Sequence, residues 1–563
     1  MGRNSVYLRL FTHRMICLPV IVFIVCCQKV PRVEKIFVNG HIVTMDESSP
    51  EVEAMAVGSG KVIAVGSSEE IEGRYPDVKS IDLQGKTVMP GIVESHGHLL
   101  SLGQSLLELN VAGIETPEEV VEMVRERVRE TEPGEWITGW GWDEGAWAKR
   151  YPDNKALSTV SPDNPVHLRG LHGFACWANE KALEIAGITA DTPDPPNGEI
   201  FKDPDSGHPT GILTNKAQDI LEQHIPELSR DRIERALELA HDECLRNGLT
   251  TVHEAKTTAE MLKAFRSLKS KNKLKIRIYG MLDAPDKDLI EPFLRNGPEI
   301  DPDHLITMRC IKVFVDGALG SRGAAFIESY SDAPDVRGVI VTPEDTLYEL
   351  TVRCLEAGLQ VATHGIGDLG NRITLNAYRR ALEDVPSAKD RRLRLEHAQV
   401  TAVEDISRFA PLGIVLSMQP PHATSDMPWA ETRVGPERIK GAYAWRSFLN
   451  SGTHLTLNSD FPGETLNPFH GMYAAETRQS PDGKPEGGWY PEQCLTRDEV
   501  LKAYTVEAAY SGFQEDYLGK LAPDFMADFI ILSDDILTIS SQDLLSLRVE
   551  QTYLSGELVY DER

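Results

Sequence analysis

The chain has 563 residues, of which 41% are hydrophobic and 26% charged, and its formal net charge at pH 7 is −28. This composition is that of an ordinary soluble globular protein, and the length exceeds that of one compact core. We therefore expect two or more domains, or one large α/β barrel with additions. Because so acidic a chain would repel a phosphate backbone, we do not expect a nucleic-acid partner.

The first 30 residues differ in character from the rest of the chain. Arg3, Arg9 and Arg14 precede an uncharged apolar run over residues 16–27, which ends in two cysteines. A basic start followed by about a dozen apolar residues is typical of a signal peptide and is short for a membrane span. We expect export to the cell envelope or periplasm, with residues 1–30 acting as a cleaved signal peptide or as a membrane or lipoprotein anchor. A wrongly assigned start would instead leave a cytoplasmic protein.

The cysteines after this segment are scattered and lack CxxC spacing. An odd, unclustered set argues against a disulfide framework and against a cysteine-based zinc site. We interpret these residues as buried thiols. They are Cys176, Cys244, Cys310, Cys354 and Cys494.

Residues 33–86 and 515–563, at opposite ends of the chain, have the same pattern of short apolar runs and tight-turn signals. Asn39-Gly40 and Ser555-Gly556 are dipeptides that favour hairpins. Neither segment alone is long enough to bury a core. We predict that the two segments form one composite β-sandwich.

Between these ends, over residues 87–514, apolar strands alternate with amphipathic helices. The predicted strands lie near 87–96, 249–254, 275–282, 308–315, 359–364, 392–397, 413–419 and 454–460. The predicted helices lie near 230–247, 257–272, 343–357, 370–384, 440–451 and 496–511. Eight strands that alternate with helices are typical of an α/β fold of the TIM-like (β/α)₈ barrel type, and a doubly wound sheet is the alternative.

Residues 101–228 interrupt the alternation after the first strand and are too long for one loop. We predict that they form an inserted subdomain over the barrel mouth. Its aromatic residues either contact an apolar or aromatic substrate or form the core of the subdomain itself. They are Trp140, Trp142, Trp147, Phe174 and Trp177.

Histidines and one aspartate recur where an apolar strand gives way to a loop. His96 and His98 point to the same face of the first strand, because side chains alternate along a strand. His364, His397 and Asp460 end three later strands. Since the carboxyl ends of barrel strands meet at one mouth, we expect these five side chains to surround a metal ion.

Lys312 lies within the strand predicted over 308–315, on the same face as Phe314 and Asp316. A lysine on a strand that is buried on both sides is costly unless it is paired, neutralised or modified. Addition of CO₂ to the neutral amine would give a carbamate able to bridge two metal ions. The alternative is an ion-paired lysine whose stem packs along apolar surface.

These residues, in this order, resemble the amidohydrolase superfamily, with HxH on the first strand, Lys on the fourth, His on the fifth and sixth, and Asp on the eighth. The segments "IKVFVDGALGSRGA", "ATHGIGD", "RLEHAQ", "SMQPPHATSD" and "NSDFP" are similar to the YtcJ-like branch, called amidohydrolase family 3. That branch includes N-substituted formamide deformylase-like proteins and has a large insertion after the first strand. The resemblance covers residues 33–563. Glu94 departs from the family motif, which has Asp at this position. We expect this difference to alter local hydrogen bonding without loss of metal binding.

The resemblance implies a zinc-dependent hydrolase with one or two ions. The metal-site residues it implies are His96, His98, His364, His397 and Asp460, with Lys312 as the carboxylated bridge. We expect hydrolysis of a non-peptide C–N bond in a small amide, formamide or cyclic amide by attack of a zinc-bound hydroxide, with Asp460 as the catalytic general base. Ester or carbamate hydrolysis on the same site is one alternative, and a non-catalytic exported binding protein is another. A homo-oligomer is compatible with the sequence.

Four further residues are candidates for contacts with the substrate. Glu254 ends the second strand next to His253, and His422 follows the seventh strand. Arg322 lies in a glycine-rich loop, where it would meet either an anionic group of the substrate or a neighbouring carboxylate. His172 lies in the inserted subdomain.

Overall fold

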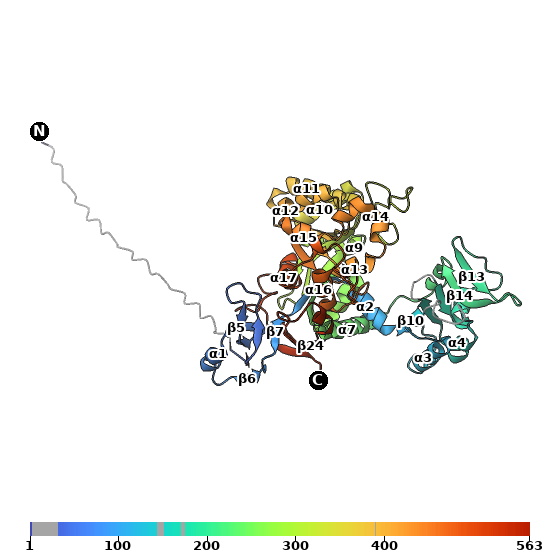
Figure 1. Ribbon diagram of the computed structural model, residues 1–563, viewed down its shortest axis with the longest axis horizontal. Helices are drawn as coiled ribbons and strands as arrows, with labels where there is room; N and C mark the ends of the chain where they lie inside the picture. The colour runs from blue at the N-terminus through green and yellow to red at the C-terminus, as the bar shows by residue number, and fades with distance from the viewer. Residues whose placement is uncertain (3–31, 143–150, 171–174, 389) are drawn as a thin grey trace.

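The computed structural model describes residues 1–2, 32–142, 151–170, 175–388 and 390–563. These residues form a barrel, a two-sheet β-sandwich and an inserted subdomain (Figure 1). The predicted export segment lies almost wholly outside the described residues. Among the helices of the described ranges, none is long and apolar enough to cross a membrane.

The central sheet contains eight parallel strands that neighbour one another in chain order. They are β8 (Ile92–Gly97), β15 (Leu249–Thr257), β16 (Arg277–Asp283), β18 (Ile306–Phe314), β19 (Gln360–Gly365), β20 (Arg394–His397), β21 (Val415–Met418) and β22 (His454–Leu457). The first and last strands meet through the Asp460 N–H, which donates to the His96 carbonyl at 3.1 Å. The Thr456 hydroxyl also donates to Ser95 Oγ at 2.9 Å. The predicted TIM-like barrel is therefore confirmed, and the doubly wound alternative is wrong.

Helices cover the outside of the barrel, and their sequences show why they form. In α7 the Ser229 side chain accepts from the Arg232 N–H at the N-cap, and Ile233, Leu237 and Ala240 follow on one buried stripe. Helices of this layer include α7 (Arg230–Arg246), α8 (Ala259–Ser270), α9 (Lys287–Asn296), α10 (Glu344–Ala357), α11 (Asp368–Asp384), α15 (Trp445–Asn450), α16 (Pro468–Thr477), α17 (Arg497–Tyr504) and α18 (Val506–Ser511). Two further helices, α13 (Pro420–Asp426) and α14 (Ala430–Arg438), follow β21.

The two ends of the globular chain meet in a sandwich of a four-stranded and a six-stranded sheet. The first has the order β5–β4–β1–β6 and the second β25–β24–β23–β7–β2–β3. Their bounds are β1 (Lys35–Val38), β2 (His41–Val43), β3 (Glu51–Val52), β4 (Ala54–Gly58), β5 (Lys61–Gly66), β6 (Lys79–Asp82), β7 (Thr87–Pro90), β23 (Phe529–Leu532), β24 (Val549–Leu554) and β25 (Glu557–Asp561). Phe37, Phe529 and Tyr553 form the aromatic centre of the core, with the Phe529 and Tyr553 rings stacked at 4.4 Å.

The single strand predicted over 87–96 is two strands in the structure. β7 belongs to the sandwich and β8 to the barrel, and Gly91 separates them. A side chain at this glycine would come within 2.2 Å of the Thr250 hydroxyl, so only glycine allows this close approach of the two strands. The chain therefore passes from the sandwich into the barrel without a loop.

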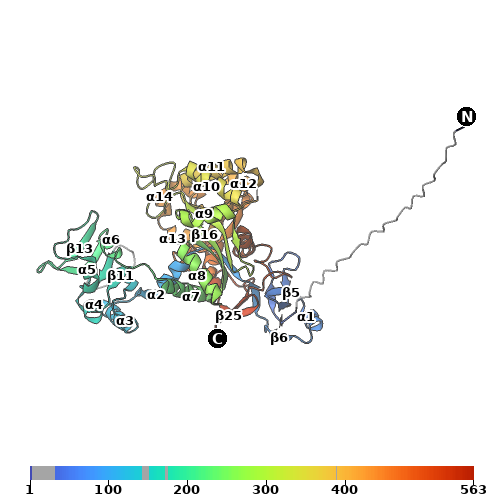
Figure 2. The same ribbon diagram turned by 180° about the vertical axis from the view of Figure 1, so that it is seen from behind.

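The insertion after β8 begins with α2 (Leu99–Leu107) and contains a separate six-stranded sheet. Its elements are β9 (Leu109–Asn110), α3 (Pro117–Arg129), β10 (Ile137–Trp142), α4 (Lys155–Val160), β11 (Val166–Gly170), β12 (Ala175–Ala178), α5 (Glu180–Ala186), β13 (Gly198–Lys202), β14 (Pro209–Asn215) and α6 (Gln218–Glu222). Trp142 and Trp177 are buried in the core of this subdomain, whereas Trp147 and Phe174 lie outside the described residues. The subdomain extends to one side of the molecule, beyond α2 (Figures 1 and 2).

A buried ion pair joins the barrel to the sandwich. Arg277, at the start of β16, is fully buried and donates to both carboxylate oxygens of Asp528 at 2.5 and 2.9 Å. Asp528 immediately precedes β23. The Arg277→Ala substitution should lower the free energy of unfolding by about 3–5 kcal/mol in urea titrations, because it leaves a buried carboxylate without its partner.

The exposed pair of Arg353 and Glu291, 2.8 Å apart, provides the control. Arg353→Ala should cost less than about 1 kcal/mol, since water screens this pair. Equal losses in the two variants would contradict a special role for the buried pair.

Candidate metal centre

Three predicted ligands meet at the carboxyl ends of the barrel strands. His96, His397 and Asp460 each offer one ligand atom, and these atoms lie within 4.8 Å of one another. The His96 Nε2 lies 3.6 Å from Asp460 Oδ1, and the His98 Nε2 lies 3.2 Å from the same oxygen. Imidazole nitrogens and a carboxylate oxygen are the donors that zinc prefers when cysteine is absent.

His364 and Lys312 border this group. The His364 ring centroid lies 4.6 Å from that of His397, and within the described part of the chain its buried Nε2 has no hydrogen-bond partner. Lys312 is fully buried, with Nζ 3.4 Å from His96 Nε2. All six residues predicted for the metal site thus lie around one end of the barrel.

Two of these residues have an unusual backbone conformation. His397 has φ +75° and Asp460 has φ +60°, in the left-handed region that non-glycine residues rarely adopt. Such conformations persist where the surroundings hold them, and they cluster at functional sites. At Asp460 the hydrogen bond from its N–H to the His96 carbonyl supplies part of that restraint.

The orientation of His96 is set by a carboxylate that the sequence analysis missed. His96 Nδ1 donates to Glu396 Oε2 at 2.6 Å, so Nε2 is left as its ligand nitrogen. Arg394 donates to both oxygens of Glu396, at 2.7 and 3.2 Å, and its Nη1 lies 2.9 Å from His253 Nδ1. The available signal was "RLRLEH", in which Arg394 and Glu396 put two charges on one face of a buried strand.

The surroundings keep the imidazoles neutral. Burial, followed by the nearby Lys312 charge, lowers the pKa of His96 to about 4 and that of His364 to about 3. Burial also lowers the pKa of His397. A neutral imidazole has a free lone pair, so at neutral pH these residues are in the form that coordinates a metal.

Asp460 is ionised in the same site. Burial raises the pKa of its carboxyl, but interactions with His96 and His98 outweigh burial and hold the pKa well below its usual range. Neutral histidines beside one carboxylate form a donor set that fits a divalent cation.

Of the four residues proposed for substrate contacts, one lies at the edge of the metal centre, two interact with other parts of the protein, and one lies outside the described residues. The His422 Nε2 lies 3.9 Å from Asp460 Oδ2, at the edge of the centre. Glu254 is buried, accepts from the Leu99 N–H at 2.7 Å and lies 4.0 Å from His98 Nδ1, so it supports the start of α2. Arg322 forms an ion pair with Asp332 at 2.7 Å, the second of the two roles considered for it. His172 lies outside the described residues.

Glu94, at the position where the family motif has aspartate, is buried beneath Asp460. It accepts from the N–H and the hydroxyl of Ser459 at 2.7 and 2.9 Å. Burial raises the pKa of Glu94 to about 8. Its side chain therefore links the first barrel strand to the segment that presents Asp460.

Asp316 is a second residue that the sequence analysis did not assign to the site. It accepts from the backbone N–H groups of Ala325, Ile366 and Gly367 at 2.8 to 3.0 Å. Its Oδ1 also lies 3.8 Å from His364 Nε2. Asp316 thus ties the loop after β18 to the loop after β19, next to a predicted ligand.

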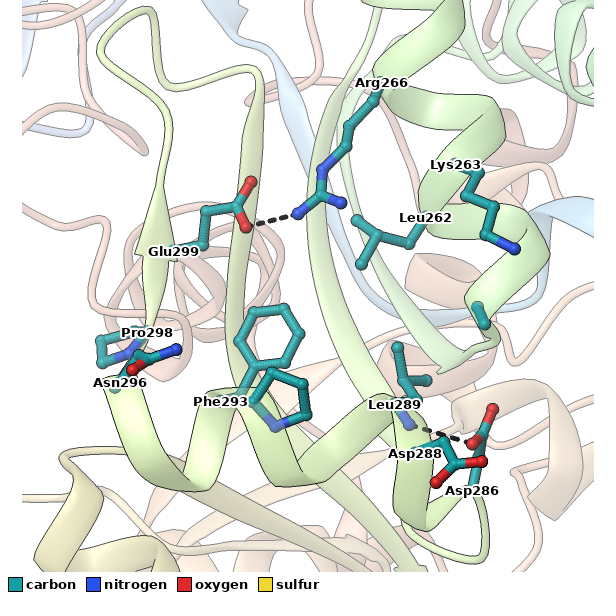
Figure 3. A pocket seen from close by; sticks show the side chains of 13 residues that line it. Leu262, Lys263, Arg266, Asp286, Asp288, Leu289, Phe293, Asn296, Pro298 and Glu299 are labelled. Carbon is teal, nitrogen blue, oxygen red and sulfur yellow. Dashed lines mark hydrogen bonds and ion pairs between the residues drawn. The ribbon is translucent and has the colours of Figure 1, made fainter.

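A hollow of about 680 Å³ lies elsewhere, between α8 and α9 on the outer wall of the barrel (Figure 3). Leu262, Leu289 and Phe293 line it, and an ion pair between Arg266 and Glu299 spans it. None of the predicted site residues within the described ranges lines this hollow. The hollow is therefore separate from the candidate metal centre.

Comparison of the sequence with known protein families shows which family the chain belongs to. The family described as "Amidohydrolase family" matches residues 79–560. The chain belongs to the amidohydrolase family. The resemblance inferred from the sequence is therefore confirmed, and this amidohydrolase is a hydrolase of carbon–nitrogen bonds other than peptide bonds.

Relatives align along nearly the whole amidohydrolase. The chain is 35% identical to Protein LONG AFTER FAR-RED 3 of Arabidopsis thaliana, over 93% of this chain and 91% of that protein. It is 33% identical to the putative amidohydrolase YtcJ of Bacillus subtilis, over 93% and 99%. It is 29% identical to the N-substituted formamide deformylase of Arthrobacter pascens, over 93% and 98%.

Solved structures of similar fold include an uncharacterized metal-dependent hydrolase from Pyrococcus furiosus. It has a TM-score of 0.75 and 29% identity, over 90% of this chain and 100% of that chain. The atrazine chlorohydrolase TrzN from Arthrobacter aurescens TC1, determined in complex with zinc, has a TM-score of 0.52 and 15% identity, over 94% and 95%. At 15% identity, the similarity to the atrazine chlorohydrolase concerns the fold alone.

The role of Glu396 in this amidohydrolase can be tested through metal affinity. Glu396→Gln keeps the size of the side chain but weakens the charged acceptor of His96 Nδ1. Zinc affinity, measured by competition with a chelator, should fall about 10- to 100-fold. Glu404→Gln, at an exposed glutamate paired with Arg372, is the matched control and should bind zinc as the wild type does. Unchanged affinity in the Glu396 variant would show that His96 does not need this partner.

Proposed function

We propose that this amidohydrolase hydrolyses the C–N bond of a small amide, formamide or cyclic amide with the help of one or two zinc ions. The observation that carries the proposal is the convergence of His96, His397 and Asp460, from the first, sixth and eighth strand ends, within 4.8 Å. A site built only to bind a neutral ligand has no need of an ionised carboxylate among neutral imidazoles.

The residues that would hold the metal are those of the predicted set. His96 is restrained by Glu396, and the His397 ring is restrained by Gln419, whose Oε1 lies 2.9 Å from His397 Nδ1. When bound, a zinc ion lowers the pKa of water and polarises a carbonyl oxygen. The N-substituted formamide deformylase, 29% identical over nearly its whole length, supports formamides as the first substrate class to try.

Asp460 is the residue placed to move the proton. Its carboxylate is ionised and lies at the centre of the cluster, with a side chain 18% exposed, so one oxygen can accept a proton from an incoming water. The same carboxyl can then give that proton to the departing nitrogen, which leaves as a neutral amine. The His422 Nε2 lies 3.9 Å from Asp460 Oδ2, within reach of a substrate held at that carboxylate.

Lys312 has the surroundings of a modified lysine. It is fully buried beside His96, and burial lowers the pKa of its amine to about 8. The neutral amine can add CO₂, forming an N–C bond and releasing one proton to solvent. We propose that the resulting carbamate bridges two zinc ions.

The hydrolase proposal is tested by Asp460→Asn. Zinc-loaded wild type should release formate or free amine from at least one member of a panel of N-formyl, N-acyl and cyclic amides. The variant should lose at least about 10²-fold in kcat, because the proton acceptor is gone. Asp335→Asn, at an exposed aspartate, is the control and should keep full activity. A fully active Asp460 variant would overturn the assignment.

The bridging role of Lys312 is tested by metal content and by NMR. Protein incubated with ¹³C-bicarbonate should show a carbamate carbon signal, and it should bind two zinc ions per chain. Lys312→Met, of similar length and without an amine, should lose the signal and bind one ion. A single bound ion and no carbamate signal in the wild type would establish a mononuclear site.

A further inference from the structure

A polar cleft of about 500 Å³ lies between α2 and the six-stranded part of the inserted subdomain. One wall is α2, whose residues at spacings of three and four positions share one helical face. The other wall is the sheet of the insertion together with α6 and the residues after it. The lining residues are Ser101, Gln104, Ser105, Glu108, Thr138, His167, Arg169, Glu222, Ile225 and Pro462.

The sheet of the insertion turns a polar face toward this cleft. His167 and Arg169 alternate along β11, so their side chains lie on the same face. Val166 and Leu168, on the opposite face, pack in the core of the subdomain. The polar residues of β11 are therefore not needed for that core.

Two features that border the cleft are close in sequence to metal-site residues. Pro462, which lines it, follows Asp460 by two residues. α2, which forms the first wall, begins directly after His98, its N-cap residue. The loop that presents Asp460 therefore borders one end of the cleft.

Among the described residues that line the cleft, one carboxylate has no cationic partner. Arg169 donates to Glu108 at 3.0 Å, so these two charges neutralise each other. His167 is 2% exposed, and burial lowers its pKa to about 3, so it is neutral at physiological pH. The Glu222 side chain is 42% exposed, and its one ion-pair partner within the described part of the chain is this neutral imidazole, with Nε2 at 3.6 Å.

We propose that this cleft binds the part of the substrate remote from the scissile bond, and that it takes a positively charged amine through Glu222. The inference rests on the proposed amide hydrolysis, to which it adds a substrate class, amides that carry a second, free amino group. The net charge of −28 favours the approach of such cations. A partly exposed ion pair contributes about 0.2–1 kcal/mol, which corresponds to an affinity ratio of up to about fivefold.

The test compares two ligands that differ only in the terminal amine, mono-N-formyl-1,6-diaminohexane and N-formylhexylamine. Their affinities for zinc-loaded Asp460→Asn are measured by calorimetry, which does not depend on turnover. The amine-bearing compound should bind about twofold to fivefold more tightly. Adding Glu222→Gln should abolish this preference, while adding Glu199→Gln, at an exposed glutamate outside the cleft, should preserve it.

Turnover by the wild type separates the two proposals. A binding preference that depends on Glu222, without hydrolysis of any amide, would refute the proposed reaction and leave the cleft assignment standing. Equal affinity for the two compounds, or a preference that survives Glu222→Gln, would overturn the cleft assignment even if both formamides are hydrolysed. As a second check, the Ser101→Trp substitution should fill the cleft. It should weaken the binding of mono-N-formyl-1,6-diaminohexane without affecting the binding of N-formylmethylamine.

Discussion

The structure depends on the junction between the first and last strands of the barrel. The Asp460 N–H donates to the His96 carbonyl, and Glu94 on β8 accepts from the N–H and hydroxyl of Ser459. These bonds close the barrel, and they are made by the neighbours of metal-site residues or by those residues themselves. Closing the barrel and bringing Asp460 within 3.6 Å of His96 are therefore one event, so a chain that fails to close has no site.

A second network of hydrogen bonds, centred on β20, explains why the site tolerates buried charge. Arg394 and Glu396 are both fully buried, and taking such ions out of water costs several kcal/mol each. Their bidentate pairing, with further bonds from Arg394 to the Ser95 carbonyl and to His253, satisfies most of their hydrogen-bonding groups. This network spans strands that lie far apart in the sequence, and it ends on His96. The burial of these two ions therefore serves to hold the His96 imidazole in a fixed direction.

The sequence predicted best the features that arise within single segments. The eight barrel strands and the polar residues at their ends were predictable because each is an apolar run followed by His or Asp, as in "LQVATH" and "LTLNSD". The break at Gly91 was not, because it depends on Thr250 of the adjacent strand. Glu396 and Asp316 were missed for the same reason, since their partners, His96 and the loop N–H groups, come from other strands. The direction in which the insertion extends is likewise set by packing beyond its own sequence.

The candidate metal centre and the proposed binding cleft are formed largely by different parts of the chain. Every described residue of the candidate metal centre comes from the barrel strands and the turns that follow them. The insertion has its own cores, around Trp142 and around Leu213, and can therefore change its exposed face without disturbing the metal-site residues. α2 connects the two, since it starts at His98 and forms a wall of the cleft that Glu222 and Arg169 complete. A substitution on β11 or α6 should for this reason alter which amide is accepted and leave the hydrolytic step as it is.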